Sequence, residues 1–152
     1  MKKLLFFLFI SYFSVSQDWN FLGYYNGAGR HHPITFSNDR YGYVIAGQNT
    51  DGTYLSDVFR YDSQDGGWDQ LSDFPGGPRG YSYGVSDGTY AYMGFGSNNS
   101  GYLNDWWRYD FINDTWEELA NFPYLGRNHP AMILCDDKIF VGMGSVDSEN
   151  LG

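Results

Sequence analysis

The sequence is poor in cysteine, histidine and basic residues: it has one cysteine, Cys135, three histidines, and nine Lys and Arg against 18 Asp and Glu. A single cysteine excludes an internal disulfide framework and a metal cluster held by several thiolates. The formal net charge of −9 argues against nucleic acid or an anionic membrane surface as a partner, because phosphate binding needs a basic surface. No apolar run after residue 16 is long enough to span a bilayer of about 30 Å. We therefore expect no membrane span in residues 17–152.

Aromatic residues and glycine are abundant instead. Phe, Trp and Tyr make up 20% of the chain, glycine accounts for 20 of the 152 residues, and charged residues for only 18%. Such a composition favours short strands and tight turns over helices. It also excludes a disordered chain, which needs few aromatic residues and much charge. We therefore expect one folded, all-β domain, the usual number for a chain of this length.

The N-terminus has the features of a secretory signal. It opens with MKK, continues with ten apolar residues (LLFFLFISYF) and then reaches small residues, SVS, that suit a cleavage site. The apolar block is too short to cross a bilayer, which takes roughly 20 residues. We predict a signal peptide over residues 1–16, cleaved near Ser16. The mature protein would be secreted, to the periplasm, the extracellular space or the cell surface.

The mature chain repeats itself at an offset of 48 residues. YLSDVFRYD at residues 54–62 recurs as YLNDWWRYD at residues 102–110, and the WxxL and FP pairs that follow recur as well. An arginine follows three of the five tryptophans, Trp19, Trp68 and Trp116, by 11 residues, and an apolar run ending in glycine follows each of these three arginines. We expect structural roles for these recurring residues, which are Trp19, Trp68, Trp116, Arg30, Arg79, Arg127, Gly47, Gly96, Gly144, Tyr61 and Tyr109.

Each unit contains four strand-like runs separated by turn residues. In the first unit the runs cover residues 31–37, 42–47, 56–62 and 67–71, with Asn, Asp, Gly and Ser between them. Four short antiparallel strands at a period near 50 describe one blade of a β-propeller.

The residues that recur in each unit follow an order that resembles the kelch repeat. The order is an arginine, an apolar strand ending in glycine, Tyr-Asp, and then Trp-x-x-Leu. The resemblance covers nearly all of residues 17–152. One feature departs from it, because Ala46, Phe95 and Met143 stand where the family has the first of two glycines. The resemblance implies an all-β, kelch-type β-propeller with four-stranded antiparallel blades.

The chain holds too few units to close a ring, which typically takes 4–8 blades. We predict an outer strand of a closing blade at residues 17–29, blade 1 at 30–78, blade 2 at 79–126 and half of blade 3 at 127–152. The propeller is therefore expected to be incomplete, with about two and a half blades plus an orphan outer strand. The remaining blades would come from a missing portion of the chain or from other copies.

The sequence indicates no catalytic set, no metal site and no cofactor. Cys135 ends an apolar run without a base near it in the sequence, which favours a core or turn role over that of a nucleophile. His32 and His129 each lie two residues after a repeat arginine, where the middle repeat has Tyr81. We interpret these positions as strand starts that face the central channel rather than as metal ligands.

One set of polar residues predicts a binding surface. In an antiparallel meander of four strands, the loop entering the first strand and the loop after the second open on the same face, and kelch propellers commonly bind ligands or protein segments there. Amide, hydroxyl, imidazole and phenol groups suit neutral polar ligands such as glycans or peptide backbone; the alternative is that these loops are an unoccupied polar surface. The predicted binding residues are His32, Tyr81, His129, Gln48, Asn49, Ser97, Asn98 and Ser145.

We therefore expect a secreted kelch-repeat propeller that acts as a binding or interaction module for protein or carbohydrate ligands. The alternative is a portion of a carbohydrate-active propeller enzyme, galactose-oxidase-like or sialic-acid mutarotase-like, whose catalytic residues lie partly outside this chain. Copper enzymes of that kind need a paired Tyr–Cys cofactor and two His ligands, and no such set is identifiable here. A purely structural cell-surface protein is a third possibility, since fold alone does not decide function.

Overall fold

The computed structural model describes residues 19–146, so the predicted signal peptide lies outside the described part. Those residues form strands and turns without a helix. The strands in chain order are β1 (Arg30–His31), β2 (Ile34–Ser37), β3 (Tyr41–Asn49), β4 (Tyr54–Asp62), β5 (Trp68–Leu71), β6 (Tyr83–Ser86), β7 (Tyr90–Gly94), β8 (Ser97–Asn98), β9 (Gly101–Tyr102), β10 (Trp106–Asp110), β11 (Thr115–Leu119), β12 (Ala131–Cys135) and β13 (Lys138–Gly142).

The first sheet contains the four runs predicted for the first unit. Strands β2, β3, β4 and β5 form an antiparallel meander, with Phe36 opposite Tyr43 and Tyr61 opposite Trp68. The predicted first run is broken in two at His32, and its first part, β1, pairs with the end of β3 beyond a register shift after Ile45. The prediction of four antiparallel strands for this unit is confirmed.

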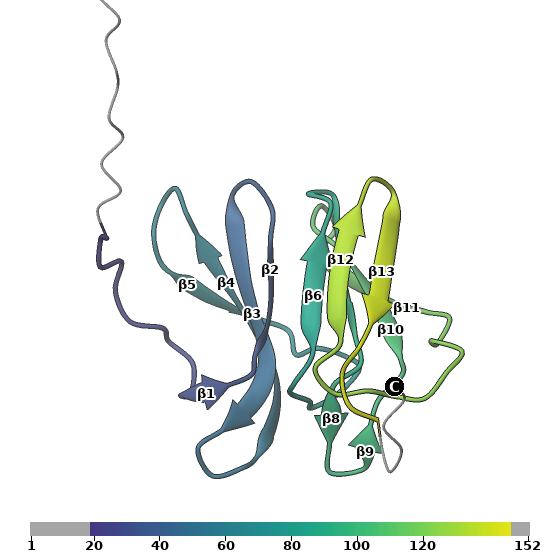
Figure 1. The fold of residues 1–152 in the computed structure, drawn as a ribbon. Helices are drawn as coiled ribbons and strands as arrows, with labels where there is room; N and C mark the ends of the chain where they lie inside the picture. The colour runs from purple at the N-terminus through teal and green to yellow at the C-terminus, as the bar shows by residue number, and fades with distance from the viewer. Residues whose placement is uncertain (1–18, 147–152) are drawn as a thin grey trace, which may run out of the picture.

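The second sheet repeats the first in the order β11-β10-β7-β6, and the short hairpin of β8 and β9 corresponds to the far ends of β3 and β4. A third pair, β12 and β13, corresponds to the first two strands of a unit. Figure 1 shows the sheets side by side, with β12 next to β6. The described residues therefore form an open arc of consecutive sheets.

The core lies between the first and second sheets. It is made of apolar residues that alternate along the strands, because successive side chains of a strand point to opposite faces. Tyr109 is 2% exposed, with the ring of Trp116 4.7 Å from its own, and Trp107 packs against Phe74 at 5.3 Å. The buried members are Ile34, Phe36, Tyr43, Ile45, Ala46, Val58, Phe74, Ala91, Met93 and Tyr109.

Each second strand ends in two residues with left-handed backbone. At Gly96 an added Cβ would lie 2.3 Å from the carbonyl oxygen of Gly80, so the second position of the pair requires glycine. The position before it, which also favours glycine, holds Ala46, Phe95 and Met143 at φ values of 55°, 62° and 58°. These three residues replace the first glycine of the pair and keep its left-handed backbone. The resulting strain costs about 1–2 kcal/mol per residue.

Residues 19–29, predicted as an outer strand, form no strand in this structure. Trp19 is 101% exposed and Leu22 is 72% exposed, whereas Trp68 and Trp116, the tryptophans predicted to recur with Trp19, are half-buried. An outer strand needs a third strand beside it, and residues 19–146 contain none that is free to pair with this segment. The closing blade stays a prediction.

Candidate binding site

The segments that precede each first strand pair with the segments that follow each second strand. Arg30 lies opposite Asn49 and His31 opposite Gln48 in the first repeat. Isolated bridges join Gly80 to Ser97 in the second repeat and Asn128 to Ser145 in the third. The two loop positions predicted to share a face are thus paired at one end of each repeat, the end that carries β1, β8 and β9 (Figure 1).

His32, Tyr81 and His129 occupy equivalent positions in three successive repeats. All three have left-handed backbone, with φ values of 50°, 62° and 51°. The amide of Tyr81 donates to the carbonyl oxygen of His32 at 3.3 Å, and the amide of His129 donates to that of Tyr81 at 2.9 Å. This chain of backbone hydrogen bonds passes from one repeat to the next and places the three side chains side by side.

The side chains form a cluster of rings, which we call the ring cluster (His31, His32, Tyr81 and His129). The rings of His32 and Tyr81 stack with their centroids 4.3 Å apart. The ring of His129 lies edge-on to both, 5.1 Å from each centroid. All three histidines are exposed and Tyr81 is half-buried, so the cluster lies at the surface.

His31 also belongs to the cluster, although it is not among the binding residues that the sequence predicts. Its Nδ1 lies 2.8 Å from Nδ1 of His32, so one of these nitrogens donates a hydrogen and the other accepts it. The ring of His31 also lies edge-on to Tyr81 at 5.8 Å. The adjacency of two histidines at a predicted strand start was the only signal for it.

Tyr81 links the ring cluster to the loop after β3. Its hydroxyl donates to Oε1 of Gln48 at 2.7 Å, and the Nε2 of Gln48 donates to the carbonyl oxygen of Gly52 at 2.7 Å. The ring of Tyr54 lies 6.3 Å from that of Tyr81, and its hydroxyl is 3.3 Å from Oγ of Ser97. The structure therefore brings His32, Tyr81, His129 and Gln48 together, with Ser97 buried behind them.

The other predicted binding residues, Asn49, Asn98 and Ser145, lie at the same end of the molecule, but their hydrogen bonds stabilise the loops. Oδ1 of Asn49 accepts hydrogen bonds from the amides of Asp51 and Thr53. Oδ1 of Asn98 accepts one from the amide of Ser100 at 2.8 Å. Ser145 exchanges backbone hydrogen bonds with Asn128 at 2.8 Å.

One member of the cluster, His32, has a shifted pKa. Partial burial, together with repulsion from His129 and then His31, holds the pKa of His32 below its ordinary value of 6.5. His32 is therefore neutral at pH 7. Within residues 19–146 no group of three or more His, Cys, Asp and Glu side chains is arranged to hold a metal ion.

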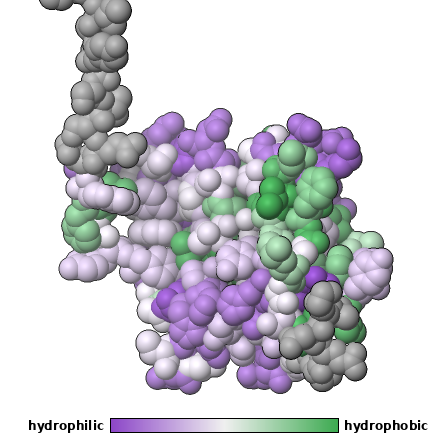
Figure 2. Space-filling view, in the orientation of Figure 1, coloured by the Kyte–Doolittle hydropathy of each residue, from purple (hydrophilic) through white to green (hydrophobic). Residues whose placement is uncertain are grey.

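A hollow of about 410 Å³ opens beside His129, between β6 and β12. Its walls are apolar apart from His129 and Tyr83, and Met132, Ile133 and Met143 are among the residues that line it. Figure 2 shows the same contrast: the end of the molecule that carries β1, β8 and β9 is largely hydrophilic, whereas apolar residues gather over β12 and β13. A ligand at the ring cluster would thus meet polar groups on one side and an apolar wall on the other.

The sequence matches no protein-family profile, and no curated protein is similar enough to it to count as a match. Solved structures do match. One is the structure of YjhT, which the chain resembles with a TM-score of 0.61 and 21% sequence identity, over 75% of this chain and 34% of that one. The chain thus spans about a third of the length of this relative, and at this identity the likeness concerns the fold alone.

The antiparallel four-stranded sheets, their repetition and this likeness show an all-β fold of the kelch-like β-propeller type, incomplete over the described residues. Among residues 19–146, no helix is long and apolar enough to cross a membrane.

Proposed function

We propose that the protein is a secreted kelch-repeat propeller that binds a polar ligand, a glycan or a protein segment, at the ring cluster. The observation that carries the proposal is the convergence of His32, Tyr81 and His129 from three successive repeats at left-handed positions. Backbone strain and exposed aromatic side chains at one place are more typical of binding sites than of packing.

The chemistry of the cluster suits a ligand with both apolar faces and hydroxyl or amide groups. The stacked rings of His32 and Tyr81 offer a flat apolar surface with polar edges, a combination that binding sites use for ligands with one apolar and one polar side. The imidazole nitrogens supply donors and acceptors that fix the orientation of such a ligand, while Gln48, whose amide is bonded to Tyr81 and Gly52, holds the ring of Tyr81 in place.

Secretion is part of the proposal and rests on residues 1–16, outside the described part of the chain. The basic start, the apolar block and the small residues before Gln17 support it. Mass spectrometry of the protein from its native host tests it, because the mature chain should begin near Gln17. Cytosolic protein that retains Met1 would contradict secretion but not binding.

The test of binding uses the protein as its host produces it, applied to immobilised glycans and peptides. We expect saturable binding to a subset of them, weakened about tenfold or more by His32→Ala or Tyr81→Ala, as for central residues of an interface. The control is Ile112→Ala, at an exposed residue of the β10–β11 turn, which should bind like the unaltered protein. Binding that none of the cluster variants weakens would contradict the proposal.

A carbohydrate-active enzyme on the same fold is the second candidate. It draws on the lowered pKa of His32, since a neutral imidazole at pH 7 can accept a proton from a bound substrate. Incubating the protein with each sugar that it binds separates the two candidates. Recovery of the sugar unchanged supports a binding module, whereas conversion that His32→Ala abolishes would assign catalysis.

A further inference from the structure

The ring cluster contains all three histidines of the sequence. His31 and His32 come from the first repeat. His129 comes from the third, and its ring centroid lies 5.1 Å from that of His32. Imidazole is the side chain whose charge ordinarily changes between about pH 5 and 8. The fold therefore gathers in one place every imidazole that the chain can protonate.

The contact between His31 and His32 limits the number of protons that the two rings can hold. Their Nδ1 atoms lie 2.8 Å apart, so one of them carries a hydrogen and the other accepts it. A neutral pair meets this condition, and so does a pair with one added proton, because a protonated ring can donate to a neutral one. With a second added proton both Nδ1 atoms carry hydrogen and both rings are positive. The second proton therefore breaks the contact.

No carboxylate compensates for positive charge on these rings. Within residues 19–146 no Asp or Glu forms an ion pair with a histidine. The loop between β3 and β4 carries one acid, Asp51, and the turn between β8 and β9 carries none. Partial burial, and then repulsion from His129 and His31, hold the pKa of His32 below its ordinary value of 6.5. The surroundings of the cluster thus oppose its protonation.

The basic side chains nearest in the sequence are also engaged elsewhere. Arg30, Arg79 and Arg127 each precede a cluster position by two residues. The first two hold a carboxylate, and Arg127 donates to a backbone carbonyl. Tyr81 keeps its hydroxyl on Oε1 of Gln48. None of these groups offers a negative charge to a protonated imidazole.

The backbone leaves the side chains to relieve the repulsion. The amide of Tyr81 donates to the carbonyl oxygen of His32, and the amide of His129 donates to that of Tyr81, so the three positions are tied together across repeats. The histidine side chains are exposed and have room to turn into solvent. Such a rotation would end the stacking of His32 on Tyr81, whose centroids now lie 4.3 Å apart.

We propose that the ring cluster is an acid-sensitive switch: it is assembled at neutral pH, and a second proton on the His31–His32 pair separates the rings and releases the ligand. Repulsion from His129 adds to the effect, because its ring lies beside that of His32. The release of ligand rests on the proposed function, whereas the opening of the cluster does not. The protein would therefore hold its ligand near pH 7 and lose it at about pH 5.

NMR of the ligand-free protein from its host tests the opening, and only three imidazole rings have to be assigned. Contacts between the rings of His32 and Tyr81 should be present at about pH 7.5 and absent at about pH 5. The signals of Trp116 in the core should stay in place, which separates opening from unfolding. In His31→Gln the contacts should persist to a pH lower by about one unit, because the ring that competes for the hydrogen is gone.

The matched control is Asp51→Asn, on the loop that carries Gln48, which should leave the titration of the three histidines unchanged. A changed titration would overturn the proposal, because a carboxylate would then compensate for the charge of the rings. Contacts between His32 and Tyr81 that persist at about pH 5 in the unaltered protein would overturn it as well.

Release is tested with the glycan or peptide that the protein binds most tightly. Its affinity should fall about tenfold or more from about pH 7.5 to about pH 5, as expected when binding requires an imidazole to be neutral. The ratio of the two affinities should be smaller in His31→Gln. Equal affinities would overturn release but not the proposed function, whereas a cluster that opens in acid and binds nothing at either pH would contradict the proposed function alone.

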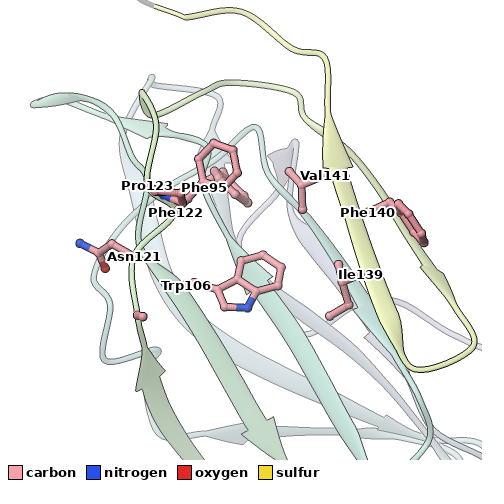
Figure 3. A pocket seen from close by; sticks show the side chains of 9 residues that line it. Phe95, Trp106, Asn121, Phe122, Pro123, Ile139, Phe140 and Val141 are labelled. Carbon is pink, nitrogen blue, oxygen red and sulfur yellow. The ribbon is translucent and has the colours of Figure 1, made fainter.

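The same measurement distinguishes the ring cluster from another hollow of the molecule, of about 500 Å³, beside β13 (Figure 3). The lining of this hollow includes Phe95, Trp106, Asn121, Phe122 and Val141, and none of its lining residues titrates between about pH 5 and 8. A ligand held there would bind equally at both pH values, which would again overturn release from the cluster.

Discussion

The ring of Tyr81 stacks on the ring of His32, with 4.3 Å between their centroids and 29° between their planes. The contact follows from the backbone, because the amide of Tyr81 donates to the carbonyl oxygen of His32 and both residues have left-handed backbone conformations. The amide of His129 donates in the same way to the carbonyl oxygen of Tyr81, although the two rings meet edge-on. The repeat itself therefore builds the ring cluster: the equivalent position of each repeat contributes one ring, and His31 adds a second ring from the first repeat.

The first prediction concerns the protonation of His32. NMR titration of its ring should give a pKa below 6.5, because of partial burial and then repulsion from His129 and His31. Since folding lowers this pKa, the contribution of neutral His32 to stability is present above pH 6.5 and declines as the pH falls below it. The variant His129→Gln should raise the pKa of His32, because it removes one of the repelling imidazoles.

A midpoint for His32 at or above 6.5 would contradict this account of the cluster. So would an unchanged pKa in the His129→Gln variant, because the rings would then not be close enough to repel each other.

The second prediction concerns the glycine at the end of β7. Gly96→Ala should destabilise the protein by more than about 1 kcal/mol, since φ is +82° and the new Cβ would lie 2.3 Å from the carbonyl oxygen of Gly80. Urea unfolding measures the change. The matched control is Gly42→Ala, where φ is not positive and nothing lies within 4 Å of an added Cβ. Equal stability of the two variants would show that the close approach at Gly96 is not required.

The third prediction compares two ion pairs. Asp105→Asn should cost about 3–5 kcal/mol of unfolding free energy, because it leaves the buried charge of Arg79 without its partner; the Arg79 side chain is 1% exposed. Glu117→Gln should cost about 0–1 kcal/mol, since Arg108 and Glu117 pair at the surface with side chains 35% and 56% exposed. Similar losses in both variants would contradict the structural role given to the repeat arginines.

The repeat made the fold predictable from the sequence. Spacing alone located the four strands of the first unit, since runs bounded by turn residues at a fixed period allow few other arrangements. It also located His32 and Tyr81, because each follows a repeat arginine by two residues. A sequence pattern that recurs with the fold thus carries information about which side chains face one another across repeats.

The remaining details depend on contacts that spacing does not encode. The sequence places Asn49 and Asn98 on the binding face, yet their side-chain oxygens are engaged by amides of their own loops. His31 joins the cluster through the break between β1 and β2, which the left-handed backbone of His32 produces. Trp19 matches the repeat tryptophans in sequence but lies exposed, because its environment depends on a neighbouring strand as much as on its own segment.

The central claim is that the protein binds its ligand at the ring cluster, and mapping the bound ligand by NMR tests it most directly. The protein from its host is titrated with the glycan or peptide that it binds most tightly, while the ring and amide signals are followed. The account predicts that the largest shifts belong to His32, Tyr81, His129 and Gln48. Shifts confined to residues of β13 or to the β10–β11 turn, with the ring signals of His32 and Tyr81 unmoved, would contradict it.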